Sequence, residues 1–108
     1  MHARMTTIHS PSERMDDGIE QVRRDILPLF RELGGFRGLI GLVNRTANTG
    51  ITISLWDDEE TMQESEGAGQ QLRQQAAAAM KAETEPMVNR YEVAYLEVES
   101  PATASVTD

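Results

Sequence analysis

Few side chains in this chain are of types that support catalysis or ligand binding, and the most informative are one tryptophan and one histidine. Trp56 is the only tryptophan, and it could stack on an aromatic ligand or donate its indole N–H. The alternative is packing in the core, which is the commoner role of a lone tryptophan. His9 could act as a general base near neutral pH, although a half-exposed, satisfied histidine is the commoner case. His2 lies near the terminus, so the two histidines do not predict a transition-metal site.

Several other side chains are candidates, and each has a commoner structural use. Asn44 opens a polar loop, where asparagine is frequent for turn geometry alone. Tyr91 and Tyr95 fall on one face of a late strand and could present hydroxyl groups, although packing at an interface is the commoner role. Met62 and Met80 could line an apolar cavity as flexible filler. These residues alone do not name a reaction.

The composition excludes several classes of function. The chain has 108 residues, enough for one domain, and a net charge of −8 that would repel nucleic acid and anionic membranes. Because cysteine is absent, disulfides, thiolate catalysis and cysteine-ligated metal are excluded. No apolar run approaches the ~20 residues that span a bilayer, and residues 1–7 lack the apolar core of a secretory signal. We therefore expect a cytoplasmic protein without a metal site.

The first half of the chain predicts a strand and one interrupted helix. Residues 3–9 alternate as a short strand. An apolar stripe at three- and four-residue spacing marks the helix that follows: Met15, Ile19, Val22, Ile26, Phe30 and Leu33. Pro28 lies inside this stripe and removes a backbone hydrogen bond, so we expect a kink or break near residues 26–27. The pair Gly34-Gly35 then ends the helix.

The second half predicts three strands and a longer helical region. The strand over residues 39–43 is apolar on both faces, and a polar loop over 44–50 connects it to an alternating strand over 51–56. A helical region is expected from about residue 58 to residue 82. The last strand is expected over residues 91–98.

Capping residues predict where the helices begin. Ser10 or Ser12 is expected to cap the first helix. Asp57 is expected to cap the second one, with Glu60 at the reciprocal position of a capping box. The acidic run in this first turn also complements the positive end of the helix dipole.

The order strand, helix, strand, strand, helix, strand predicts an α+β, ferredoxin-like split βαβ fold with a four-stranded antiparallel sheet. We expect one domain over residues 1–99 and a disordered tail over 100–108. Two helices cover only one side of such a sheet, yet the second strand is apolar on both faces. Burying each exposed apolar side chain is worth roughly 1.5–3 kcal/mol, and a second copy of the sheet would provide the cover. We therefore predict a homodimer with two sheets face to face.

Three segments resemble the dimeric α/β-barrel superfamily, and in particular its antibiotic-biosynthesis-monooxygenase-like domains. One is Leu33–Gly38, which contains a Gly-Phe-x-Gly turn after the first helix. Another is Ile53–Glu60, where a strand ends in tryptophan and acidic residues open a helix. The third is Pro86–Val93, with proline before a Tyr-Glu-Val strand. The resemblance covers residues 3–99 and implies two subunits that form one barrel.

The resemblance also implies a pocket between sheet and helices within each subunit. It implies oxygenation of a small aromatic or polyketide-like substrate without metal, flavin or other cofactor. The residues assigned to the pocket are Asn44, Trp56, Phe36, Met62 and Met80, and those assigned to catalysis are His9 and Trp56. Trp56 and Asn44 would orient the substrate, and His9 would help to deprotonate it.

Two other functions are compatible with this fold, namely haem degradation and binding without catalysis. Haem-degrading members of the superfamily carry a histidine on the second helix and an asparagine on the first strand, and this chain has neither. The second alternative is a homodimer that binds a small ligand, or serves in a stress response, without catalysis, because a fold does not fix a function. A cavity bordered by Trp56 and polar groups would favour the enzyme, whereas one filled by Phe36, Met62 and Met80 would favour the alternative.

Overall fold

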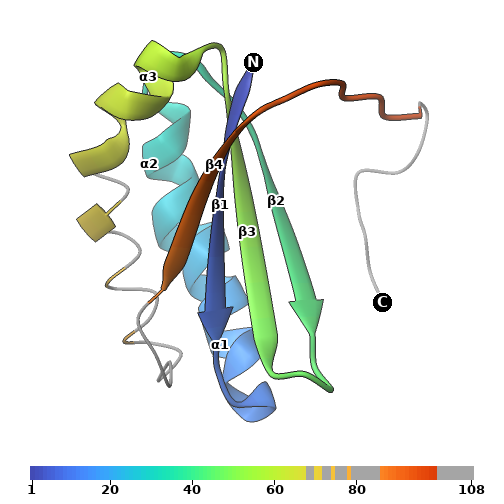
Figure 1. The fold of residues 1–108 in the computed structure, drawn as a ribbon. Helices are drawn as coiled ribbons and strands as arrows, with labels where there is room; N and C mark the ends of the chain where they lie inside the picture. Colours follow the sequence, from blue (N-terminus) through green and yellow to red (C-terminus); the bar gives the residue numbers. More distant parts are fainter. Residues whose placement is uncertain (68–69, 72–73, 75–77, 79–85, 100–108) are drawn as a thin grey trace.

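The structure is a computed structural model that describes residues 1–67, 70–71, 74, 78 and 86–99 (Figure 1). Its elements are β1 (His2–His9), α1 (Ser12–Gln21), a π-helical turn (Val22–Ile26), α2 (Leu27–Arg31), β2 (Phe36–Asn44), β3 (Thr49–Trp56), α3 (Glu59–Glu64) and β4 (Met87–Glu92). The strands form one antiparallel sheet in the order β2-β3-β1-β4. This arrangement confirms the α+β ferredoxin-like prediction. The predicted tail over 100–108 lies outside the described residues, as does much of the predicted helical region beyond residue 67.

Proline interrupts the first helix at the predicted place. Pro28 has no N–H, so the ordinary bond from residue 28 to the carbonyl four residues back cannot form. Just before it, the Leu27 N–H bonds the Val22 carbonyl five residues back, which closes a π-helical turn. α2 then carries the proline in its first turn, where a missing N–H is tolerated. The predicted break near residues 26–27 is confirmed.

The cap of α3 lies one residue later than predicted. Asp58 is the N-cap: its carboxylate accepts the Thr61 N–H at 2.8 Å, and its own N–H donates to the Thr61 hydroxyl at 3.4 Å. Asp57 instead forms an ion pair with Arg37 on β2. Its N–H donates to the Gly35 carbonyl at 2.8 Å, which ties the start of β2 to the end of β3. The prediction of Asp57 was wrong because these tertiary contacts fix its position.

The predicted serine cap of α1 was also wrong. Pro11 occupies the N-cap position, and no side chain bonds the free N–H groups there. The Ser12 hydroxyl lies 2.6 Å from the Arg45 carbonyl and 2.7 Å from the Asn48 side-chain oxygen, both in the β2–β3 turn. The Ser10 hydroxyl donates to the Pro11 carbonyl at 3.3 Å. The serines thus join the helix start to the hairpin.

The last strand begins and ends earlier than predicted. β4 spans Met87–Glu92, and its partners on β1 run from Thr7 back to His2. The Val93 N–H donates to the Met1 carbonyl, after which no strand continues through residue 98. The prediction of residues 91–98 followed the high strand propensity of Tyr and Val. Pairing with β1 decides the boundary instead, so β4 ends where β1 begins.

The helices lie on one side of the sheet (Figure 1), and the apolar core forms between them. Its buried residues are Ile26, Phe30, Trp56 and Met62, with Val22, Leu33, Phe36 and Leu39 packed against them. The predicted stripe of the first helix therefore supplies much of this core. The core is concentrated under β2 and β3, at the end of the sheet where β3 runs into α3.

The opposite side of the sheet is largely apolar, and none of the helices that the structure describes covers it. Strand alternation and pairing place two rows of side chains across it: Ile40, Ile53, Met5 and Asn89 in one, and Leu42, Ile51, Thr7 and Met87 in the next. Leu42 is 49% exposed and Met87 is 55% exposed. We call these two rows, together with Tyr91, the outer face. The prediction that one flank of the sheet carries apolar side chains is confirmed.

Candidate functional site

An arginine on β1 is buried on the helix-covered side of the sheet. Arg4 is only 2% exposed. Its Nη1 donates to the Ser65 hydroxyl at 2.9 Å and to the Met62 carbonyl at 3.4 Å, and it lies 3.3 Å from the Glu66 carboxylate. Its Nη2 is buried and has no hydrogen-bond partner among the residues that the structure describes. A buried guanidinium with an unused donor is uncommon, since burial of charge is costly unless every N–H finds a partner.

Aromatic rings hold this guanidinium in place. The Arg4 Cζ atom lies 5.5 Å from the centre of the Trp56 ring and 6.0 Å from that of Phe30. The two rings meet edge to face at 5.7 Å, and Phe36 packs against both. The Trp56 indole N–H donates to the Ser54 hydroxyl at 2.9 Å. The arrangement combines a cation–π contact with a rigid aromatic wall.

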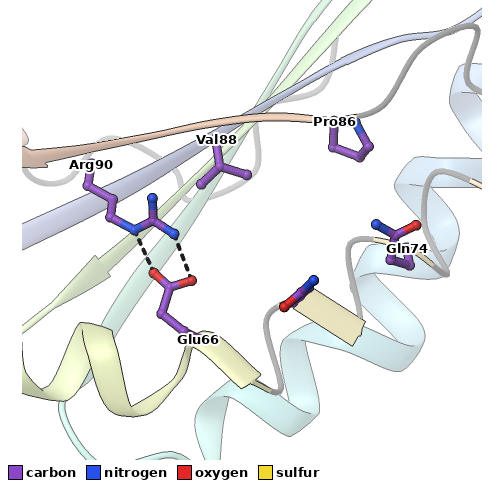
Figure 2. Close-up of a pocket in the computed structure, with 6 residues that line it drawn as sticks. Glu66, Gln74, Pro86, Val88 and Arg90 are labelled. Carbon is purple, nitrogen blue, oxygen red and sulfur yellow. Dashed lines mark hydrogen bonds and ion pairs between the residues drawn. The ribbon is translucent and has the colours of Figure 1, made fainter.

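A second arginine reaches the same carboxylate from the edge strand. Arg90 on β4 pairs with Arg4 in the strand register. Figure 2 shows the Arg90 guanidinium and the Glu66 carboxylate joined by two parallel hydrogen bonds, of 2.7 Å from Nε and 2.9 Å from Nη2. The bond from Arg90 holds the pKa of Glu66 below its ordinary value, and the charge of Arg4 adds to this effect. Burial lowers the pKa of Arg4, while Glu66 opposes that change.

A cavity of about 310 Å³ opens beside this ion pair. It lies between β4 and the segment after α3 (Figure 2), and it is lined by Glu66, Gln70, Gln74, Pro86, Val88 and Arg90. Its volume is at the lower end of the range for small-molecule sites. Amide and guanidinium groups give it hydrogen-bond donors, and Val88 and Pro86 give it an apolar side.

The structure brings together only some of the residues assigned to the pocket from the sequence. Trp56, Phe36 and Met62 form one buried cluster behind Arg4, and Trp56 has no exposed surface. None of the three lines the cavity. Met80 lies outside the described residues. The aromatic cluster therefore contacts Arg4, which in turn contacts Glu66 at the edge of the cavity.

His9 and Asn44 lie at the far end of the sheet. Both pair with Thr49, whereas Trp56 pairs with His2 at the other end of β1. An eight-residue strand is about 23 Å long between its end residues, so one bicyclic molecule cannot touch both His9 and Trp56. His9 is half-buried, and its Nδ1 lies 3.5 Å from the Thr49 hydroxyl. The Asn44 side-chain oxygen accepts the Ala47 N–H at 3.0 Å and so stabilises the turn.

The sequence reasoning missed Arg4, Glu66 and Arg90. One signal was present: alternation from Ile8 through Thr6 places Arg4 on the face of β1 that packs against the helices. A charged residue on such a face is unusual enough to mark a candidate site. No sequence signal pairs Arg4 with Glu66, which is 62 positions away.

Neither a metal site nor a membrane-spanning helix is found in the part of the chain that the structure describes. No group of three or more histidine, aspartate or glutamate side chains there is arranged to hold a metal ion. Among those same residues, no helix is long and apolar enough to cross a membrane.

The chain resembles proteins of undetermined function in sequence. No family model matches it. An uncharacterized protein of Mycobacterium tuberculosis, Rv2557, is 32% identical over 94 residues, which cover 87% of this chain and 41% of that protein. A second one, Rv2558, is 29% identical over 102 residues, or 94% of this chain and 42% of that protein. The chain thus spans about two fifths of the length of the curated relatives that it matches.

Comparison with solved structures defines the class of fold. The monooxygenase ActVA-Orf6 of Streptomyces coelicolor, in complex with nanaomycin D, superposes with a TM-score of 0.76 at 14% identity over 92% of both chains. SnoaB, a cofactor-independent oxygenase of Streptomyces nogalater, gives 0.56 at 16% identity over 91% of this chain and 95% of its own. The chain therefore has the dimeric α/β-barrel fold of the antibiotic biosynthesis monooxygenases, as its resemblance to them predicted.

Proposed function

We propose that this protein binds a small aromatic or polyketide-like molecule in the cavity beside Glu66 and Arg90 and oxygenates it without a cofactor. The single observation that carries the proposal is this cavity, which lies between β4 and the lining residues that follow α3 and which contains a guanidinium donor. The structural likeness to a monooxygenase in complex with nanaomycin D supports the choice of an aromatic ligand. Arg90 would bind a ligand oxygen, and Val88 would contact the ring.

The proposed reaction uses the electrons of the substrate. Loss of a proton from an anthrone gives an electron-rich enolate, which a neighbouring cation stabilises. The enolate transfers electrons to dioxygen, one oxygen atom becomes a carbonyl of the product, and the other leaves as water. An anthrone and one dioxygen thus give an anthraquinone and one water. The roles predicted for His9 as a base and for Trp56 in orientation are tested by the variants below.

A second candidate is a protein that binds the same kind of ligand without turning it over. It is favoured by the environment of Trp56, which is 0% exposed and sealed by Phe30, Phe36 and Met62. In that packing the indole cannot touch a ligand in the cavity. Under this alternative the cavity serves for binding alone.

Oxygen uptake separates the two candidates. The purified protein is incubated with dithranol, an anthrone, while an oxygen electrode follows uptake and absorbance follows the quinone. An enzyme consumes one dioxygen per quinone above the uncatalysed rate, and Arg90→Gln lowers that rate. Trp56→Phe and His9→Ala test the predicted catalytic pair, and unchanged turnover in both would remove their assignment. Binding of dithranol without uptake would support the second candidate.

We further propose that the protein is a cytoplasmic homodimer in which two outer faces pack together. Proteins with this fold are typically dimeric. The outer face supports the proposal because its isoleucine, leucine and methionine side chains lack cover from the helices α1, α2 and α3. Sedimentation equilibrium at micromolar concentration tests it, and a stable monomer would overturn it.

A further inference from the structure

We infer that the cavity beside Glu66 and Arg90 selects aromatic carboxylates over neutral aromatic molecules, because two arginines there share a single carboxylate. This inference rests on the proposed function, since it takes the cavity to be the binding site. It goes further because it states the charge of the ligand. It also proposes that the Glu66 carboxylate competes with the ligand carboxylate for Arg90.

The first argument is the balance of charge. Arg4 and Arg90 are neighbours in the β1–β4 register, and both contact Glu66. Over the described residues, neither guanidinium meets a second carboxylate within ion-pair distance. Among the described residues, these two positive groups and one negative group leave one positive charge in excess. An anionic ligand would complete the balance.

The second argument is the balance of hydrogen bonds. A guanidinium offers five N–H donors. Arg90, which lines the cavity, uses Nε and one N–H of Nη2 on Glu66, and its other three N–H groups form no hydrogen bond to the residues that the structure describes. The lining residues Gln70 and Gln74 each add two amide N–H groups and one acceptor oxygen. The site is therefore rich in donors, and a carboxylate, which only accepts, suits it better than an amide does.

The third argument is the contrast with the rest of the chain. The net charge is −8, so the average field of the protein repels anions. Selection of an anion must then come from local contacts. Arg4 supplies a charge that is 98% buried, where it is screened little by water and salt. Arg90 is nearer to solvent and would contact the ligand, while Arg4 acts through Glu66 as a positioning residue.

The arrangement predicts variant effects of opposite sign. Arg90→Gln removes the ligand contact and should weaken carboxylate binding about tenfold. Glu66→Gln removes the competing carboxylate and should strengthen carboxylate binding by about the same factor. If the ion pair served folding alone, both variants would distort the cavity and both would bind the carboxylate more weakly. Arg45→Gln, which removes a surface arginine at the hairpin end of the sheet, is the matched control and should change nothing.

The experiment uses two probes with one ring system, 2-naphthoate and 2-naphthamide, titrated into the purified protein at pH 7. The wild type should bind 2-naphthoate about tenfold more tightly than 2-naphthamide. Added salt should weaken binding of the carboxylate and leave that of the amide nearly unchanged. This salt comparison needs only the wild type, so it holds even if a variant fails to fold.

The possible outcomes are separable. Equal affinity for both probes would overturn the inference and leave the proposed binding of aromatic molecules in place. Binding of neither probe would overturn that proposed function and the inference with it. Weaker carboxylate binding in Glu66→Gln, with the circular dichroism of the wild type, would also overturn the inference. Opposite signs for the two variants and a flat control would support it.

Discussion

Both faces of this sheet depart in part from those of an ordinary half-covered sheet. The face beneath the helices buries polar groups, including Arg4, Thr6 and Ser54, each under 10% exposed. The outer face, which the helices do not reach, carries rows of isoleucine, leucine and methionine. In a sheet with one solvated face, the apolar residues lie under the helices and the polar ones face water.

This difference separates two tasks. The apolar outer face suits association, because burial of apolar surface there stabilises a complex without any exact bonding pattern. The polar groups on the covered side suit recognition, because Arg90 and Glu66 border the cavity and Arg4 contacts the same carboxylate. The apolar core that remains under the helices is concentrated around Trp56. Four variants test this division of tasks.

The largest effect is expected at the centre of the outer face. Ile53 lies between Ile40 and Met5 in the strand register. Ile53→Asp should dissociate the dimer, because it places an unpaired carboxylate in apolar surroundings at a cost of several kcal/mol. We expect the dimer dissociation constant to rise at least ~1,000-fold by sedimentation equilibrium. Ile53→Val is the control and should leave the dimer intact; a dimeric Ile53→Asp protein would contradict the proposed interface.

The next effect is expected in the aromatic core of the covered face. Trp56 is fully buried and contacts Phe30 and Phe36. Trp56→Ala should lower the free energy of unfolding by about 3–5 kcal/mol in urea denaturation, because it leaves a large cavity. Trp56→Phe keeps a ring and should cost less. If Trp56→Ala lowered the free energy of unfolding by less than ~1 kcal/mol, Trp56 would not be part of a packed core.

A smaller change in stability is expected for the buried arginine. Arg4→Met removes two hydrogen bonds and a cation–π contact, but it also removes the cost of burying a charge. We expect the free energy of unfolding to change by less than about 1.5 kcal/mol, while the preference for 2-naphthoate over 2-naphthamide declines. Arg4→Lys keeps the charge and should retain part of that preference. A loss above ~3 kcal/mol with unchanged preference would make Arg4 a structural residue.

The smallest effect is expected in the response to acid. The pKa of Glu66 lies below its ordinary value of 4.5 in the folded protein, chiefly through the bond from Arg90. Its contribution to stability is therefore complete above the unfolded pKa and is lost as the pH falls through the folded one. The wild type should lose its stability advantage over Glu66→Gln as the pH falls below about 5, as urea denaturation would show. An advantage that grows toward acid would contradict the ion pair.

Much of the fold could be predicted from the sequence because its signals are local. The helical stripe, the effect of Pro28 and the alternation from Ile51 to Trp56 each depend on neighbouring residues. Errors arose where distant pairing decided the outcome. β4 ends at Glu92 because β1 provides no further partners, and Asp57 does not cap α3 because Gly35 and Arg37 hold it.

The candidate site was less predictable for the same reason. Trp56 stood out as the only tryptophan, and its place at the end of a strand before a helix was predicted correctly. Its neighbours from other elements could not be predicted, because Arg4 and Phe30 reach the indole only after β1 and α2 have packed against β3. Ser54 is a local neighbour, since it lies two residues before Trp56 on the same face of one strand. His9 and Trp56 each end a strand, and antiparallel neighbours end at opposite edges of a sheet. The predicted antiparallel topology therefore already implied their separation, which the assignment of both residues to one site overlooked.

Local signals along the chain are enough for the order of the elements, the break in the first helix and the apolar flank of the sheet, since periodicity and propensity act over a few residues. The burial of Arg4, the pairing of Arg90 with Glu66 and the cavity beside them depend on the folded chain. Charges 24 to 62 positions apart interact only after the sheet has set its register.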